Sequence, residues 1–306
     1  MKKAIYHGIR DVRVESVAEP QPAVGEVKVK IKYCGICGSD LHEYLHGPFP
    51  VSSFGHEVCG EVVSVGESVA GFAPGDHVVS IFKGGYAEYM VAPQERCLRL
   101  PDDLNWQKAA VLEPLGVAAY GAERGNVQPT DTAFIAGAGP VGLMQTVAFK
   151  ALGIETVYVS EISEKRRQIA QKLGATATFD PTDTKISAKI RELTNGKGVD
   201  VSVEAVGIEA TLKDCLASTR FQGKVIVQGI FTERAMVHML GFVTKEMTMI
   251  GVNNANPVRS LEWIVNQPIS PEAMVTRIAP LEEISENGFE RLIHNKDEEA
   301  KILIAP

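Results

Sequence analysis

Valine and isoleucine alternate with lysine over residues 27–32, near the start of the chain. A period of two is typical of a strand that buries one face and exposes the other, here a lysine face. Further apolar stretches at 58–65 and 77–82 are separated by glycines and a Pro-Gly-Asp turn, which indicates more strands. We expect no helix of normal length before about Trp106. The first hundred residues are therefore predicted to form a mainly β domain.

The second half of the chain has a different pattern, in which apolar strands alternate with helical segments. The strands are predicted at 132–136, 157–160, 199–203 and 224–228, and the helices at 141–152, 163–173, 186–193 and 211–218. Strands that alternate with helices of this length imply a parallel sheet that is covered on both faces. The predicted fold class is α/β, with a doubly wound parallel sheet of the Rossmann type beside the mainly β domain.

The length of 306 residues corresponds to about two domains. One more helix is expected near residues 260–266, and the chain ends in a strand-like segment at 301–305. This last part is too short to fold alone, so we expect it to return to the β domain. The predicted domains are a β domain of residues 1–115 and 256–306 and a nucleotide-binding domain of residues 116–255.

Aspartate and glutamate (38) outnumber lysine and arginine (31), which gives a net charge of −7. Such a chain lacks the basic surface that a nucleic-acid-binding protein needs. Its five cysteines are too scattered for a disulfide framework, which favours a reducing compartment. The longest uncharged run, 132–149, is interrupted by glycines and a proline and fits a strand-turn-helix better than a membrane span. We expect a cytoplasmic protein that binds neither nucleic acid nor membrane.

A glycine-rich turn follows the predicted strand 132–136 and opens the next helix. Its residues are Gly137, Ala138, Gly139, Pro140, Val141 and Gly142, and Glu161 lies nineteen residues further, at the end of the following strand. A G-x-G-x-x-G turn in this setting is typical of dinucleotide binding, with the pyrophosphate at the helix N-terminus. Glu161 should accept hydrogen bonds from a ribose diol and repel a 2′-phosphate, which favours NAD over NADP.

The basic residues at 165–167 weaken this preference, although they also fit a solvated helix face. We include Arg166 among the candidate cofactor-binding residues. Gly229 and Ile230 are included as well, because they follow the predicted strand 224–228.

Two segments of the β domain carry potential metal ligands: Cys34, Cys37 and Asp40 in the first, and His56, Glu57 and Cys59 in the second. One reading is a closed structural zinc site made by the three cysteines and the histidine. The other is an open catalytic site made by Cys37, His56 and one or two carboxylates. Spacing alone favours the closed site, but a closed site leaves no position for chemistry. Asp40 could orient His56 or cap a helix.

Several motifs occur in one order along the chain: GICGSDLH, GHEVCGEVVSVG, GDHVV, GGYAEY, LEPLGVA, GAGPVG and the tail GFERLIHNKDEEAKILIAP. Together they resemble the zinc-containing medium-chain dehydrogenases, and within them the 2,3-butanediol and sorbitol dehydrogenase branch. The resemblance covers essentially the whole chain and implies a GroES-like catalytic β domain. It implies that Cys37, His56 and Glu57 bind a catalytic zinc and that Glu113 binds it directly or through water. Cys34 and Cys59 then become core residues.

The chain departs from this family in one place. Many relatives insert a lobe with four cysteines, which holds a structural zinc, between the GD-x-V and GG-x-AEY strands. Here only four residues separate Val79 from Gly84, so we predict one zinc and no structural zinc. The segment between His46 and His56 also looks shortened.

The resemblance implies an NAD-dependent dehydrogenase that acts on a secondary alcohol, vicinal diol or polyol, with the matching ketone as the other small-molecule partner. Ser39 resembles the hydroxyl that passes on the alcohol proton, and His42 resembles the exit of this relay to solvent; alternatively they are a helix cap and a surface imidazole. Family members form dimers or tetramers, so a homo-oligomer is expected. The alternatives are a zinc-free quinone or enone reductase and a nucleotide-binding module with a structural zinc.

Overall fold

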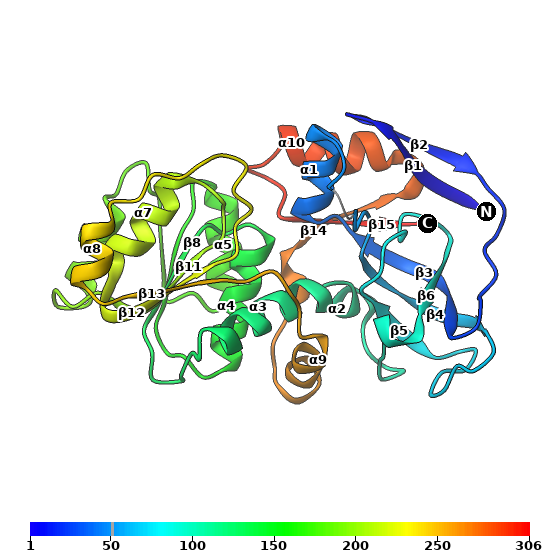
Figure 1. The fold of residues 1–306 in the computed structure, drawn as a ribbon, viewed down its shortest axis with the longest axis horizontal. Helices are drawn as coiled ribbons and strands as arrows, with labels where there is room; N and C mark the ends of the chain where they lie inside the picture. Colours follow the sequence, from blue (N-terminus) through cyan, green and yellow to red (C-terminus); the bar gives the residue numbers. More distant parts are fainter. Residues whose placement is uncertain (50–51) are drawn as a thin grey trace. The chain divides into compact units, whose positions relative to one another are not determined.

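The structure is a computed structural model that describes residues 1–49 and 52–306 (Figure 1). The chain divides into two compact units. The first contains Met1–Glu113 and Val275–Pro306, and the second contains Pro114–Met274.

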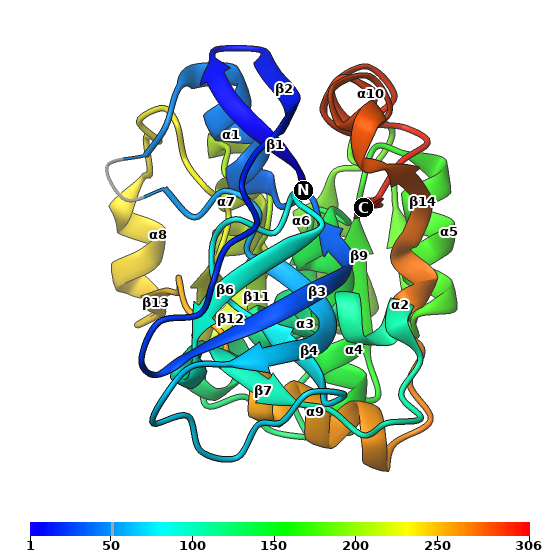
Figure 2. The same ribbon diagram turned by 90° about the vertical axis from the view of Figure 1, so that its right-hand side faces the viewer.

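The first unit is built around a seven-stranded sheet. Its order is β14-β15-β3-β4-β5-β7, and β6 pairs with β3, as Figure 2 shows for the central strands. The strands of this sheet are β3 (Glu26–Gly35), β4 (Glu57–Val65), β5 (His77–Ser80), β6 (Tyr89–Pro93), β7 (Cys97–Arg99), β14 (Val275–Pro280) and β15 (Lys301–Ala305). A separate hairpin consists of β1 (Lys2–Gly8) and β2 (Asp11–Ser16). The prediction of a mainly β domain is confirmed.

The C-terminal strand β15 inserts between β14 and β3, parallel to the first and antiparallel to the second. The expected return of the tail to the β domain is therefore confirmed. The lysine face of β3 is only partly as expected. Lys30 and Lys32 are exposed, whereas Lys28 is buried by an ion pair with Glu19 and by the ring of Tyr89, 5.3 Å from its Nζ.

Helix α1 (Gly38–His46) contradicts the expectation that no helix of normal length precedes Trp106. The segment is too polar for its pattern to stand out, and contacts with the rest of the unit stabilise it. The carboxylate of Asp40 accepts a hydrogen bond from the N–H of Cys37 at 3.0 Å, at the start of the helix. Tyr44 is buried and stacks on Phe289 with ring centroids 4.6 Å apart.

Short helical segments complete the first unit. They are Gln94–Arg96, α2 (Trp106–Ala110), Leu281–Glu283, Ile284–Glu290 and α10 (Arg291–His294), whereas the short helical segment Pro271–Met274 ends the second unit. The helix α3 (Leu112–Arg124) begins with the last two residues of the first unit and continues in the second.

The second unit is a six-stranded parallel sheet with the order β10-β9-β8-β11-β12-β13. This is the order 3-2-1-4-5-6 of the doubly wound dinucleotide-binding fold, so the predicted fold class is confirmed. The strands are β8 (Ala133–Ala136), β9 (Val157–Ser160), β10 (Ala177–Phe179), β11 (Val199–Glu204), β12 (Thr219–Val227) and β13 (Thr248–Gly251). The helices are α4 (Pro140–Ala151), α5 (Glu164–Lys172), α6 (Ile186–Leu193), α7 (Glu209–Ser218), α8 (Met239–Thr244) and α9 (Pro257–Asn266).

Residues 256–274 group with the second unit and not with the β domain, in contrast to the predicted boundary. The N–H of Asn256 donates to the carbonyl of Gly116 at 2.8 Å, and Gln267 donates to the carbonyl of Ala151 at 3.1 Å. Trp263 of α9 is buried. These contacts join α9 to α3 and α4, which sequence periodicity could not reveal.

Among the described residues, no helix is both long and apolar enough to cross a membrane.

Candidate active site

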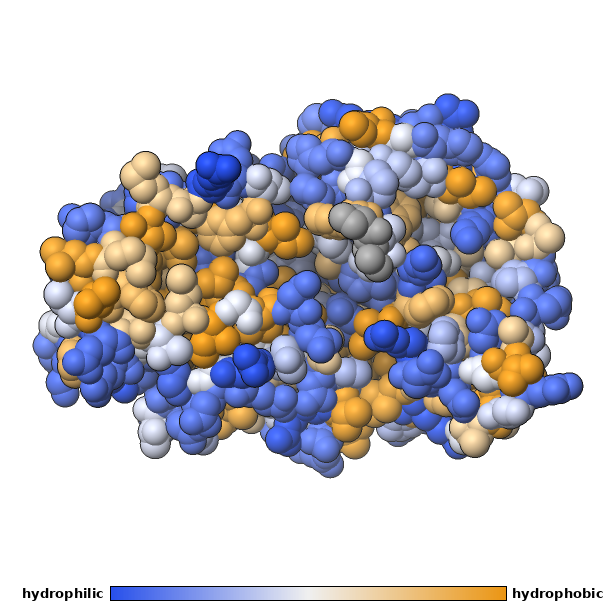
Figure 3. Space-filling model, in the orientation of Figure 1, coloured by the Kyte–Doolittle hydropathy of each residue, from blue (hydrophilic) through white to orange (hydrophobic). Residues whose placement is uncertain are grey.

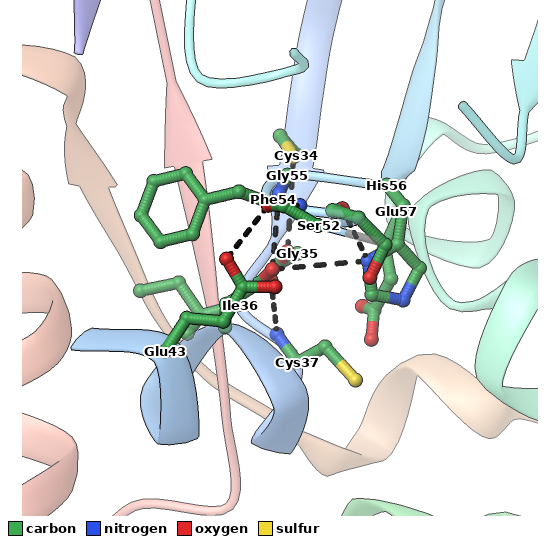
Figure 4. Close-up of polar contacts among 12 residues, drawn as sticks. Cys34, Gly35, Ile36, Cys37, Glu43, Ser52, Phe54, Gly55, His56 and Glu57 are labelled. Carbon is green, nitrogen blue, oxygen red and sulfur yellow. Dashed lines mark hydrogen bonds and ion pairs between the residues drawn. The ribbon is translucent and has the colours of Figure 1, made fainter. Parts of the chain in front are cut away.

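Three potential metal ligands come together where β3 and β4 meet α1 (Figure 4). Cys37 immediately precedes α1, His56 immediately precedes β4, and Glu57 is the first residue of β4. One ligand atom from each lies within 4.8 Å of the other two. The antiparallel pairing of Gly35 with Glu57 holds the two segments side by side. A thiolate, an imidazole and a carboxylate at this separation are a donor set suited to zinc.

Hydrogen bonding around His56 leaves one of its ring nitrogens for a metal. Nδ1 donates to the carbonyl of Ser53 at 2.9 Å and lies 3.8 Å from a carboxylate oxygen of Asp40. Nε2 is therefore the remaining ligand atom. Burial by itself lowers the pKa of His56, but hydrogen bonds with Asp40 and Cys37 outweigh burial and raise the pKa well above its usual value.

The carboxylate of Asp40 is fully buried and joins three parts of the site. One oxygen accepts from the N–H of Cys37 at 3.0 Å and from the hydroxyl of Tyr86 at 2.7 Å. The other accepts from the N–H of Gly55 at 3.0 Å. Asp40 therefore holds both the start of α1 and the segment that carries His56. Each of the two predicted roles, helix capping and orientation of His56, is thus supported by a contact.

Glu57 forms a buried ion pair with Lys301 of β15, and both side chains are inaccessible to solvent. The Nζ of Lys301 also donates to the carbonyl of Ile36 at 2.9 Å. Burial lowers the pKa of Lys301, but the charge and hydrogen bond of Glu57 together with the charges of Cys37 and Glu113 outweigh burial and raise it above its usual value. A Cβ atom at Gly35 would collide with the carboxylate of Glu57, so only glycine fits there. Lys301 was not among the predicted site residues. It could have been found in the sequence as the one charged residue of an otherwise apolar strand.

Glu113, in the first turn of α3, is also buried. Burial raises the pKa of its carboxyl to about 7; the charge of Glu57 acts in the same direction and that of His56 in the opposite one. These interactions mean that Glu113 lies near the three ligands. Glu113 is not part of the group of three, whose ligand atoms all lie within 4.8 Å of one another.

In the second unit, the glycine-rich turn connects β8 to α4 with the geometry that a phosphate site requires. Gly137 has φ of +100°, a conformation that favours glycine. A Cβ atom at Gly142 would collide with the carbonyl of Gly137, whereas Gly139 faces open space. Glu161 accepts from the N–H of Ala138 at 2.8 Å and from the N–H of Ser163 at 3.0 Å. The acidic residue is thus bound to the turn itself.

Exposed apolar side chains surround the carboxyl ends of the neighbouring strands, which is where doubly wound sheets bind ligands. Ile162 follows β9, Val206 and Ile208 follow β11, and Ile230 follows β12; their exposed fractions lie between 44% and 61%. The loops after β11 and β12 are in contact, since a Cβ atom at Gly229 would collide with the N–H of Gly207. Sequence reasoning found Gly229 and Ile230 but missed the three other apolar residues, which could have been found by their positions after strand ends.

The sequence matches two known domains. Residues 23–102 match the alcohol dehydrogenase GroES-like domain, and residues 140–265 match the zinc-binding dehydrogenase domain. The chain is 35% identical to (R,R)-butanediol dehydrogenase of Bacillus subtilis over 348 aligned positions that cover 100% of both proteins. The chain belongs to the zinc-binding dehydrogenase family. It is therefore an oxidoreductase that acts on CH–OH groups.

This dehydrogenase is also 30% identical to the sorbitol dehydrogenase of Bacillus subtilis, with 100% of the chain and 97% of the relative covered. The crystal structure of 2R,3R-butanediol dehydrogenase from Bacillus subtilis has a TM-score of 0.92 and 34% identity, and the match covers 100% of this chain and 99% of that one. The predicted resemblance and the two-part fold are confirmed.

The cysteines differ in their surroundings, and this bears on the closed zinc site considered above. The thiol of Cys34 is buried against the carbonyl of Gly35, and burial raises its pKa well above the usual value. The thiol of Cys59 contacts the carbonyl of Trp106, and burial raises its pKa to about 12. Among the described residues, neither cysteine lies close enough to two other potential ligands to form a metal-binding group of three. The geometry favours the open donor set for the zinc of this family.

Three further residues were predicted for the proton relay and the cofactor site, and each makes few contacts in the structure. The Oγ of Ser39 is buried, and within residues 1–49 and 52–306 it has no hydrogen-bond partner. The ring of His42 stacks on Phe49 with centroids 4.5 Å apart. The N–H of Arg166 donates to the hydroxyl of Ser163 at 3.2 Å, within the first turn of α5.

Proposed function

We propose that this protein is an NAD-dependent zinc dehydrogenase of a secondary alcohol, with a vicinal diol or a polyol as the substrate class. The observation that carries the proposal is the group formed by Cys37, His56 and Glu57. Three protein ligands leave a fourth position open, as catalytic zinc sites require. The butanediol and sorbitol dehydrogenases among the relatives support the substrate class.

The reaction converts an alcohol and NAD⁺ into a ketone, NADH and a proton. Cys37, His56 and Glu57 would hold the zinc, and Glu113 would contact it directly or through water, at the fourth position that the alcohol takes when it binds. Zinc in such a site supplies Lewis acidity, which favours loss of the proton from an alcohol hydroxyl. Ser39, whose hydroxyl has no partner among the described residues, would accept this proton at Oγ while it passes its own hydroxyl proton on toward His42. His42 on the next turn of α1 releases it to solvent.

The second unit binds NAD. The N-terminus of α4 and the glycine-rich turn (Gly137, Gly139, Pro140, Val141 and Gly142) hold the pyrophosphate. Glu161 accepts hydrogen bonds from the adenosine ribose, since each carboxylate oxygen can accept more than one bond. Its charge repels the 2′-phosphate of NADP. The loop residues Gly229 and Ile230 would complete the apolar wall, and Arg166, in the first turn of α5, is a further candidate for contact with NAD.

We further propose that each chain holds a single zinc. Four residues separate Val79 from Gly84, too few for a lobe with four cysteines. The alignment with the butanediol dehydrogenase runs over 348 positions, whereas the chain has 306 residues, which supports a shortened chain. The cytoplasm is the proposed location, because all five cysteines are free thiols.

A homo-oligomer that forms through the edge strand β13 is also part of the proposal. β13 is the last strand of its sheet and pairs only with β12 among the described strands. Apolar residues lie on this face near α8 (Figure 3), and Leu240, Val243 and Met249 are 63%, 66% and 44% exposed. An unpaired apolar edge favours pairing with a second copy of the same strand.

Metal analysis combined with an activity screen tests this function. We expect about one zinc per chain, and NADH formation from butanediols, sorbitol or simple secondary alcohols. His56→Ala should lose both zinc and turnover while the fold persists, because it removes a direct ligand. Cys59→Ala is the matched control and should keep both.

Other results would refute parts of the proposal. Zinc loss in Cys59→Ala would favour the structural zinc module. Full activity without zinc would favour a zinc-free reductase, and two zincs per chain would refute the single-zinc assignment.

A further inference from the structure

Helix α1 carries two histidines one turn apart. Residues 42–46 read His-Glu-Tyr-Leu-His, and residues four apart lie on the same face of a helix. The rings of His42 and His46 confirm this arrangement, since their centroids are 4.9 Å apart with planes tilted by 47°. Two imidazoles with this spacing on one helix are a recurring zinc-binding arrangement.

Both imidazoles are available to a ligand. His46 is exposed and His42 is half-buried. Across the described ranges 1–49 and 52–306, neither ring makes a hydrogen bond or an ion pair, in contrast to His7 and His294, which contact carboxylates. The other side of the His42 ring stacks on Phe49 with planes only 14° apart, which restricts its orientation. A restricted ring loses less entropy when it binds an ion.

We propose that His42 and His46 form a second metal site, which binds an added divalent transition-metal ion other than the catalytic zinc, such as Ni²⁺. Imidazole nitrogen suits these ions, whereas Mg²⁺ and Ca²⁺ prefer oxygen ligands. This site is separate from the catalytic group, which uses Cys37, His56 and Glu57. Two protein ligands leave the remaining coordination positions to water.

The site does not have the geometry of a hydrolytic centre, although its sequence has the His-Glu-x-x-His pattern of metalloproteases. In such enzymes the glutamate acts as the general base at the metal. Here Glu43 is buried and accepts a hydrogen bond from the hydroxyl of Ser52 at 2.7 Å, as Figure 4 shows. Glu43 therefore anchors the segment before His56 and is not placed to act as a general base at an ion on the two imidazoles.

An ion on His42 would slow the dehydrogenase. A metal takes the lone pair of the imidazole, so His42 can no longer carry a proton. This consequence rests on the proposed function, in which His42 releases the alcohol proton to solvent. Metal binding itself does not depend on that function.

The binding test uses the zinc-loaded protein dialysed against Ni²⁺, with nickel and zinc both counted by mass spectrometry. We expect one nickel per chain with the zinc retained. His46→Ala should bind nickel at least about tenfold more weakly, because even loss of a group that only supports a metal ligand costs 10–100-fold. His238→Ala is the matched control, since His238 is also exposed but lies in the second unit, and it should bind nickel like the wild type.

The activity test measures alcohol-dependent NADH formation at increasing Ni²⁺. Wild type and His238→Ala should be inhibited over the range in which nickel binds. His46→Ala should keep the basal rate and need at least about tenfold more nickel for the same inhibition. Equal nickel affinity in wild type and His46→Ala would overturn the site. An inactive wild type that still binds nickel through His46 would refute the proposed function but not the site.

Discussion

Replacing Lys301 by methionine is expected to destabilise the first unit strongly. Methionine has a similar length and no charge, so the substitution leaves the buried carboxylate of Glu57 without its partner. The carbonyl of Ile36 also loses its hydrogen bond from Nζ. Because both charged groups are inaccessible to solvent, water cannot replace the lost lysine.

Breaking a fully buried ion pair by removing one partner costs about 3–5 kcal/mol. An exposed pair, by contrast, contributes about 0–1 kcal/mol. We therefore expect Lys301→Met to lower the free energy of unfolding of the zinc-free protein by about 3–5 kcal/mol. Zinc should reduce the loss, because a bound cation beside Glu57 compensates its charge.

The assay can follow the first unit alone. The chain has two tryptophans, Trp106 in the first unit and Trp263 in the second. In a Trp263→Phe background, fluorescence during urea unfolding reports the surroundings of Trp106. The measurement is made with a chelator present and is repeated with zinc.

The double variant Lys301→Met with Glu57→Gln is the control. It removes both charges, so it should recover a large part of the stability lost in Lys301→Met. The reasoning is refuted if Lys301→Met costs less than about 1 kcal/mol, as an exposed pair would. It is also refuted if the double variant is as unstable as Lys301→Met alone.

Three further predictions concern other parts of the molecule. Glu161→Gln removes the charge that repels a 2′-phosphate, so the ratio of NADPH to NADH affinity, measured by fluorescence titration, should rise; an unchanged ratio would remove Glu161 from this role. Burial raises the pKa of Glu299, but hydrogen bonds from Thr276, Arg291 and Arg277 outweigh burial and lower it. Its stabilising contribution is therefore complete above the pKa of the unfolded chain, about 4.3, and disappears as pH falls through the lower folded value. Glu299→Gln should thus cost more stability at pH 7 than at pH 3 in thermal unfolding, and an equal loss at both would contradict this sign. Met249→Asp should shift the protein toward monomers in light scattering, whereas a monomeric wild type would refute the proposed edge pairing.

Strong local patterns explain why much of the fold could be predicted. The parallel sheet was predictable because its strands are buried on both faces and are apolar throughout, as in β8 and β9. Helix α1 was not predictable, because its sequence is polar and the stacking of Tyr44 on Phe289 comes from tertiary structure. The assignment of α9 failed for the same reason, since its partners α3 and α4 are distant in sequence.

The sequence by itself determined which residues can supply chemistry: Cys37, His56 and Glu57 in adjacent motifs, and the glycine turn with Glu161. Short-range sequence fixes these because the turn conformation and the strand ends are local properties. Only the tertiary structure decided that Lys301, 244 residues after Glu57, neutralises that carboxylate. Burial has the same origin, because the exclusion of water that raises the pKa of Glu113 depends on packing between segments that no local pattern brings together.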